Sequence, residues 1–242
     1  NNGLYGNIML HIPIKNNQLN ISINNRNTNN QISPIGVLEN TFSETLNHRL
    51  GFTSYGKNNY INFIIEEYSM IYGIPPSLEG HINGVDIDLF KKTFQINYHQ
   101  DISILEFNQL DINYNLIDYK HKEFENNLDY YSVLLAKRTN NLKIEFNSDD
   151  LTIGSEIDYN IFSPEGFYWT PQTNELDFSF YAFYNRELYG IDFLSSFRMG
   201  YISISPAKNG SFSNLDTEEV QTKNFGKVSF AGGLRKKNKK FE

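Results

Sequence analysis

Apolar and polar residues alternate with a period of two along most of the chain. Leu19, Ile21 and Ile23 alternate with asparagine and serine residues, and the same alternation returns in several later segments. Successive side chains of a β-strand point to opposite faces, so each such segment has one apolar and one polar face. No segment keeps a 3.6-residue period over the length of a helix. The pattern predicts an all-β protein.

Eleven strands are expected from this alternation and from the polar segments that interrupt it. Segment 60–72 is less regular, because it carries apolar residues at both odd and even positions. Pro13 falls inside a strand pattern and cannot donate a ladder hydrogen bond, so its strand is expected at a sheet edge or at a bulge. The expected strands are 4–14, 18–25, 41–55, 60–72, 86–99, 105–118, 129–138, 142–161, 173–185, 191–204 and 223–234.

The connections between these strands alternate in length. The expected short ones are 15–17, 57–59, 100–104, 139–141 and 186–190, and the long ones are 26–40, 73–85, 119–128, 162–172 and 205–222. An up-and-down transmembrane barrel has short turns on its periplasmic side and long loops outside, whereas the crossings of a soluble sandwich give no reason for such alternation. Several expected strands also exceed the ~9–11 residues of a tilted membrane span. We therefore predict an antiparallel up-and-down transmembrane β-barrel, of which this chain contributes about 11–12 strands.

Composition narrows the function classes. The net charge of −7 and the pI near 5.3 argue against a nucleic-acid partner. The chain has no cysteine, which excludes disulfides and thiolate sites. Its 19 Phe and 16 Tyr residues occur together with a polar mean hydropathy of −0.49. That combination suits a sheet with one face against lipid and the other against water. The chain has no apolar stretch of ~18 residues, so it is either soluble or spans a membrane by strands.

Three loop-and-strand stretches resemble the barrel of TonB-dependent receptors, in particular the subgroup associated with zinc or haem uptake. The first, 26–41, resembles a loop with Arg, Ser-Pro and Gly-x-Leu-x-Asn-Thr. The second combines Tyr72-Gly-Ile-Pro75 with the downstream Val-Asp-Ile-Asp-Leu of 85–89. The third, 162–174, resembles a later Pro-x-Thr loop that leads into a strand of alternating Phe and Ala.

This resemblance implies a large plugged barrel of the 22-stranded type, of which residues 1–242 would form part of a single barrel domain. It also implies partners: outer-membrane lipid, a plug domain, the periplasmic protein TonB, and a small nutrient ligand. The expected function is TonB-energised uptake of a scarce nutrient, such as a metal chelate, haem or zinc, across the outer membrane of a Gram-negative bacterium. Neither the plug nor the TonB-contacting motif occurs in these residues, so we expect a fragment of a longer protein.

Ligand contact is expected in the external loops. In zinc-type members, the loop after Tyr-Gly-Ile-Pro carries a cluster of histidine and acidic residues, and here that loop offers Glu79, His81 and Asp86. An aromatic triplet in another long loop could hold an apolar or ring-bearing ligand, and it consists of Phe167, Tyr168 and Trp169. We assign no metal ligand and expect no cofactor.

No enzyme is expected. The sequence has no nucleophile elbow, phosphate-binding loop or His-Glu-x-x-His motif. The adjacent carboxylates Glu66-Glu67 and Asp149-Asp150 would point to opposite faces of a strand, so neither pair converges on one bond. Two other functions stay open: a porin-like outer-membrane barrel without energised transport, and a soluble, secreted β-domain that binds a ligand.

Overall fold

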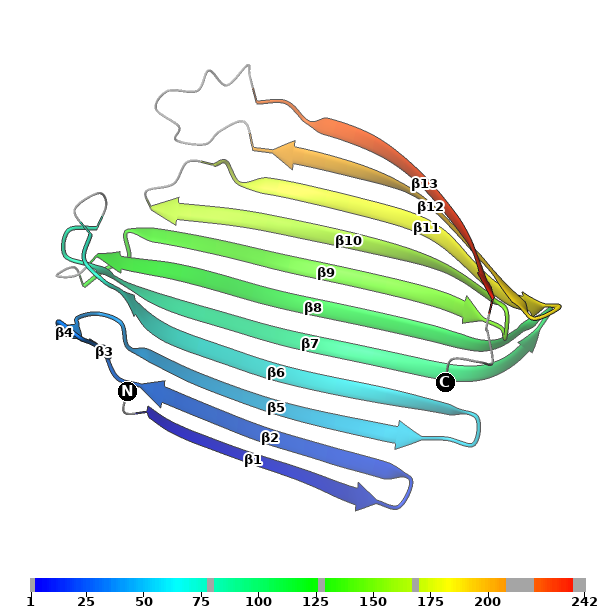
Figure 1. Cartoon of the computed structure of the whole chain (residues 1–242), viewed down its shortest axis with the longest axis horizontal. Coiled ribbons are helices and arrows are strands. Elements are labelled where there is room, and N and C mark those ends of the chain that lie inside the picture. Colours follow the sequence, from blue (N-terminus) through cyan, green and yellow to red (C-terminus); the bar gives the residue numbers. More distant parts are fainter. Residues whose placement is uncertain (1–2, 78–80, 126–128, 167–169, 208–219, 237–242) are drawn as a thin grey trace.

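The computed structural model describes residues 3–77, 81–125, 129–166, 170–207 and 220–236. These residues form one sheet of eleven strands, in which each strand pairs antiparallel with its neighbours in chain order, and a small two-stranded hairpin, β3–β4 (Figure 1). The all-β, up-and-down prediction is confirmed. The strands are β1 (Gly3–Ile14), β2 (Asn17–Thr28), β3 (Gln31–Ser33), β4 (Gly36–Leu38), β5 (Ser43–Tyr55), β6 (Asn59–Ile74), β7 (Val85–Ile104), β8 (Phe107–Glu125), β9 (Val133–Asn147), β10 (Leu151–Gly166), β11 (Thr173–Leu188), β12 (Ile191–Pro206) and β13 (Lys223–Lys236).

Short and long connections alternate, as predicted, and lie at opposite ends of the sheet (Figure 1). Two predicted turns are wrong. Residues 100–104 belong to β7, and the connection to β8 lies at 105–106 instead. Residues 139–141 do not form a connection, because β9 runs through them without a break and pairs with both β8 and β10. The turn lies instead at 148–150, where the amide of Ser148 donates to the carbonyl oxygen of Leu151 over 2.8 Å.

Asn140 and Asn141 explain this error. Asparagine favours turns because its side chain bonds to nearby backbone, but here both side chains bond to neighbouring strands. The Tyr114 hydroxyl donates to Asn140 Oδ1 over 3.1 Å, and Asn141 Nδ2 donates to Asp158 Oδ1 over 2.8 Å. Asparagine residues in a sequence do not reveal which cross-strand partners their side chains will have. The turn preference of asparagine therefore led to a predicted turn inside β9.

One row of apolar side chains crosses the entire sheet. Directly paired residues of neighbouring strands share a face, and the register connects eleven positions in an unbroken line. Ten of them are apolar or aromatic, and glycine occupies the last. The row consists of Ile12, Leu19, Phe52, Phe63, Ile96, Tyr114, Leu142, Ile157, Phe178, Tyr201 and Gly226. We call the face that carries it the apolar face.

The opposite face, here called the polar face, carries a parallel row of hydrophilic side chains. Starting from β2, this row has amides and a threonine on the first strands and charged side chains on later ones. It consists of Gln18, Thr53, Asn62, Asn97, Asn113, Lys143, Glu156, Ser179, Gly200 and Lys227. The alternation read from the sequence therefore continues in register across neighbouring strands.

The side chains of the polar face are more buried than those of the apolar face. In a soluble protein, the apolar side chains would be the buried ones. In the described residues, every buried side chain except Leu134 belongs to the polar face, including Thr53, Thr93 and Ser179. Large apolar side chains of the apolar face are exposed, for example Phe178 at 44%. Side chains crowd together on the concave side of a curved sheet, so this difference identifies the polar face as the concave one.

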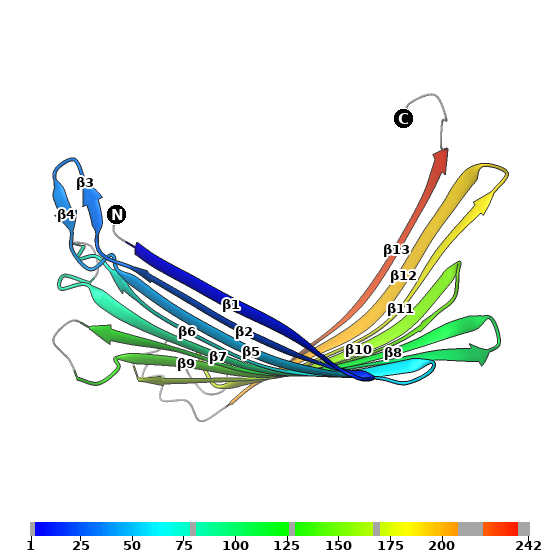
Figure 2. The same ribbon diagram turned by 90° about the horizontal axis from the view of Figure 1, so that it is seen from below.

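The sheet is strongly bent and remains open between β1 and β13 (Figure 2). Pro13 lies on the edge strand β1, as predicted. Because the eleven strands of the sheet, edge strands included, alternate in direction, β1 and β13 run in the same direction. Antiparallel closure of this sheet therefore requires an odd number of further strands. In the described residues, no helix has the length and hydropathy of a membrane-spanning helix.

Candidate functional site

The polar face of β5–β9 carries hydrogen-bonded amides. Asn62 Nδ2 donates to the Thr53 hydroxyl over 2.7 Å, and Asn97 Nδ2 donates to Asn62 Oδ1 over 3.2 Å. Farther along the sheet, Asn115 Nδ2 donates to Asn141 Oδ1 over 3.1 Å. These neutral groups join neighbouring strands and present both donors and acceptors to the concave side.

From β9 to β13 the polar face becomes charged, and Tyr181 lies at the centre of the charged network. Its hydroxyl donates to Glu145 over 2.8 Å, and the cationic groups of Lys143 and Arg198 lie 5.9 and 5.8 Å from its ring centroid. Arg198 also donates to the Ser179 hydroxyl over 2.8 Å and pairs with Glu156 at 3.4 Å. Lys143 and Arg198 are balanced by Glu145 and Glu156 within the sheet. The network therefore stabilises the sheet and leaves none of these four charges unpaired.

Tyr181 requires a glycine on the neighbouring strand. A Cβ at Gly154 would lie 2.7 Å from Cε2 of Tyr181, closer than real Cβ contacts. Gly154 and Tyr181 are direct cross-strand partners. The missing side chain therefore allows the tyrosine ring to lie flat across β10, a known pairing of aromatic side chains with strand glycines.

On the apolar face, a row of alternating charges follows the apolar band toward the long loops. The register places Glu67, Lys92, Asp118 and Arg138 side by side on β6–β9. Lys92 Nζ lies 2.7 Å from Glu67, and Arg138 Nε lies 2.6 Å from Asp118. Toward the long loops, ion pairs therefore replace apolar side chains on this face.

At the long-loop end, the first two stretches that resemble receptor barrels meet. Asn40, from the first stretch, donates from Nδ2 to the carbonyl oxygens of Ile74 (2.9 Å) and Val85 (3.1 Å), which belong to the second. A Cβ at Gly73 would lie 2.7 Å from the backbone oxygen of Asn40, so this contact excludes a side chain at Gly73. The amide therefore ties one long connection to the next.

Two predicted ligand-binding residues lie near this junction. His81 is 45% exposed, and its Nδ1 lies 2.6 Å from Glu125 Oε1. Asp86 lies on β7, paired with Gly73 and Phe124, and its parity places it on the apolar face. His81 lies in the connection before β7, whereas Asp86 is the second residue of β7 itself. No group of three or more His, Asp or Glu residues with metal-site spacing occurs among the described residues.

The other predicted ligand-binding residues lie outside the described part of the chain: Glu79, Phe167, Tyr168 and Trp169.

Sequence reasoning missed Glu125 as the partner of His81, because 44 residues separate them. It also missed the Tyr131 hydroxyl, which donates to Glu165 over 2.9 Å at the same end of the sheet. That hydrogen bond raises the pKa of Tyr131, because the neighbouring carboxylate disfavours the phenolate. In both pairs, only the strand register brings the two residues together.

No protein-family model and no curated protein matches this sequence. Solved structures do resemble it. The FrpB iron transporter from Neisseria meningitidis (F3-3 variant) aligns over 97% of this chain with a TM-score of 0.74 and 10% identity, and the copper transporter OprC over 96% with a TM-score of 0.74 and 8% identity. At such low identity, these TM-scores show a shared fold alone. The alignments cover 42% and 40% of those proteins, so this chain spans about two fifths of their length.

Proposed function

We propose that this chain forms part of the wall of an outer-membrane transporter barrel, with its apolar face toward lipid and its polar face toward a water-filled lumen. The observation that carries this proposal is the apolar row that crosses all eleven strands opposite a row of polar side chains. On β10, the apolar positions from Leu151 to Ile161 would cover about 26 Å along the membrane normal, at ~3.4 Å per residue and ~40° tilt. A transmembrane barrel needs an apolar band of ~25 Å.

A soluble β-domain is less well supported. Such a domain would bury its apolar face against a second layer, but the described residues contain one large sheet, and its apolar side chains are exposed. In lipid, open sheet edges would leave backbone groups without partners. The proposal therefore includes closure of the barrel by an odd number of strands beyond these eleven, with residues 1–242 belonging to one barrel domain.

The proposed cargo is a metal-bearing nutrient taken up with energy from TonB. The resemblance of the three stretches to TonB-dependent receptors supports this assignment, and the similar solved structures are named as iron and copper transporters. Within this proposal, a plug domain fills the lumen, and a metal chelate, haem or zinc is the transported ligand. We propose no enzymatic role.

The first test is fractionation of cells that express the full-length protein. We expect recovery in the outer membrane as a β-rich protein whose electrophoretic mobility changes on heating. Growth on limiting iron, copper, zinc or haem, with and without TonB, then identifies the nutrient class. Recovery as a soluble monomer without detergent would exclude the transporter function.

The proposed ligand contacts are Glu79, His81, Phe167, Tyr168 and Trp169 in the external loops, together with Asp86 at the start of β7. Replacing the aromatic triplet by alanines is expected to lower uptake of the identified nutrient without changing the amount of barrel in the membrane. The matched control replaces Tyr189, a fully exposed residue in the short turn at the other end of the sheet, by alanine. Equal uptake by the two variants would contradict the proposed contact.

A further inference from the structure

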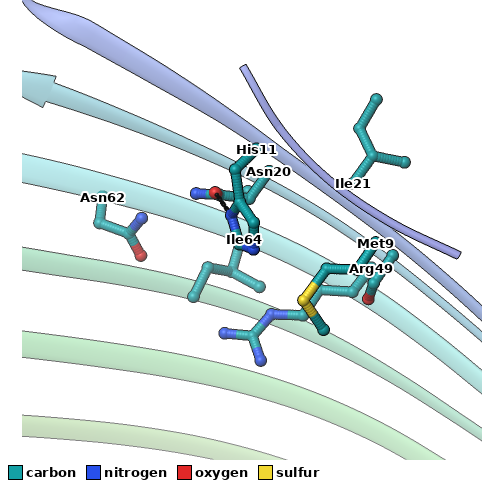
Figure 3. Close-up of a pocket in the computed structure, with 9 residues that line it drawn as sticks. Met9, His11, Asn20, Ile21, Arg49, Asn62 and Ile64 are labelled. Carbon is teal, nitrogen blue, oxygen red and sulfur yellow. Dashed lines mark hydrogen bonds between the residues drawn. The ribbon is translucent and has the colours of Figure 1, made fainter. Parts of the chain in front are cut away.

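A cavity of about 360 Å³ lies on the polar face near the edge of the sheet (Figure 3). Its volume lies within the ~300–1,000 Å³ range of small-molecule sites. Eight of its nine lining residues have the parity of the polar face, two from each of four adjacent strands. They are Met9 and His11 from β1, Asn20 and Ser22 from β2, Arg49 and Gly51 from β5, and Asn62 and Ile64 from β6, with Ile21 as the ninth.

Arg49 gives this cavity a positively charged group that forms no ion pair among the described residues. None of the nine lining residues is acidic. Arg49 forms no ion pair with any described carboxylate, although Glu66 is its cross-strand partner on β6. Glu66 instead accepts a hydrogen bond from Asn47 over 3.2 Å. Arg198 on β12 differs, because it pairs with Glu156.

Asn20 adds an oriented neutral donor. Its Oδ1 accepts from Gln18 Nε2 over 2.9 Å and lies 2.6 Å from His11 Nδ1, so the carbonyl end of this amide is occupied on both sides. Figure 3 shows the contact between His11 and Asn20 beside the cavity. These bonds fix the amide and leave its nitrogen, which can only donate, for a ligand.

Two further lining residues give the cavity its apolar surface. Met9 and Ile64 contribute a flexible thioether and a buried aliphatic side chain. Ile64 is one of the apolar residues on the polar parity of segment 60–72 that make this segment irregular in the sequence. The cavity thus combines a guanidinium and a fixed neutral donor with an apolar surface, and none of its nine lining residues is acidic.

We propose that this cavity binds a small ligand that carries a carboxylate on an apolar body, with the carboxylate on Arg49 and the apolar part against Met9 and Ile64. Guanidinium binds carboxylate through two parallel hydrogen bonds, which gives both strength and orientation. The inference deepens the proposed function, on which it rests for the ligand's role as cargo. It adds a wall site within the lumen, separate from the external loops, and defines the cargo as an anionic, carboxylate-bearing compound.

The test measures binding of 4-fluorobenzoate to the full-length protein in detergent micelles by fluorine NMR. We expect saturable binding that weakens at least about tenfold in Arg49→Gln, the loss typical of a charge-assisted hydrogen bond. Arg49→Lys is expected to recover part of the affinity. The matched control is Arg198→Gln, which removes a paired arginine from the same face and should leave the affinity unchanged. The neutral analogue 4-fluorobenzamide should bind weakly to every variant.

Two outcomes would overturn the proposal: no saturable binding to the wild-type protein, or equal affinity of wild type and Arg49→Gln. Heat-modifiable mobility of each variant verifies that it is folded. The fractionation experiment tests the proposed function separately. A soluble protein that binds 4-fluorobenzoate through Arg49 would retain the site and exclude the transporter, whereas an outer-membrane barrel without such binding would retain the transporter and exclude the site.

Discussion

The two faces of this sheet differ in which side chains are buried. On the polar face, Thr53 and Ser179 are 6% and 1% exposed although hydrophilic. On the apolar face, Phe178 and Tyr201 are each 44% exposed although aromatic. A soluble protein distributes these residue types the other way round. This distribution agrees with the proposal that the apolar face lies against lipid, while many side chains of the polar face hydrogen-bond to one another.

The largest effect is expected from a charge placed in the apolar row. Leu142→Arg introduces a guanidinium between Tyr114 and Ile157. Arginine at the bilayer midplane costs a barrel about 2–4 kcal/mol, so urea unfolding from lipid vesicles should show a loss of that size. Asn141→Arg, one position away on the polar face, should stay within about 1 kcal/mol, since Glu156 and Asp158 lie beside it. Equal losses of stability in Leu142→Arg and Asn141→Arg would contradict the proposed difference in environment between the two faces.

The next effect concerns the long-loop end, where Gly73 contacts Asn40. Gly73→Ala would force the Asn40 amide away from its two carbonyl acceptors, at a cost of about 1–3 kcal/mol for overpacking. Gly226→Ala is the control, because nothing lies within 4 Å of a Cβ there. Heat-modifiable gel mobility across a temperature series measures both. Full stability of Gly73→Ala would show that the Asn40 contact does not fix this end of the sheet.

A smaller effect is expected inside the polar network. Tyr181→Phe removes the hydroxyl that donates to Glu145 and should cost about 0.5–1.5 kcal/mol. Tyr159→Phe changes a tyrosine of the apolar face whose hydroxyl bonds to no described residue, and we expect no loss. The urea midpoints of the two variants compare how much one hydroxyl contributes to the free energy of unfolding on each face. A larger loss for Tyr159→Phe would contradict the assignment of the polar face as the hydrogen-bonded one.

The smallest effect is expected where the apolar face becomes charged. Arg138→Ala breaks an exposed ion pair with Asp118, so the stability difference should be slight and should vanish at high salt. Unfolding in low and high salt, with Asp118→Ala and the double variant, measures the coupling. A salt-independent loss would mean that Arg138 acts through packing and that the charged row does not mark a water-exposed boundary.

Strand parity and the alternation of connection lengths were predictable from the sequence, because both follow from local patterns. The turn at 148–150 was not, since Asn140 and Asn141 use cross-strand partners that a single segment cannot reveal. The same limit applies to the candidate sites. His81 was chosen from its loop, but its contact with Glu125 depends on the register of β7 and β8. The Arg49 cavity likewise requires four strands to be in register before its lining exists.

The most direct test of the central claim uses the absence of cysteine from this chain. Single cysteines introduced at Asn141, Leu142, Lys143 and Ile144 of β9 can each carry a spin label in the membrane-inserted full-length protein. Labels at positions 142 and 144 should be accessible to oxygen dissolved in lipid, and labels at 141 and 143 to a water-soluble nickel chelate. Water accessibility at all four positions would contradict the account, because the apolar face would then have no lipid against it.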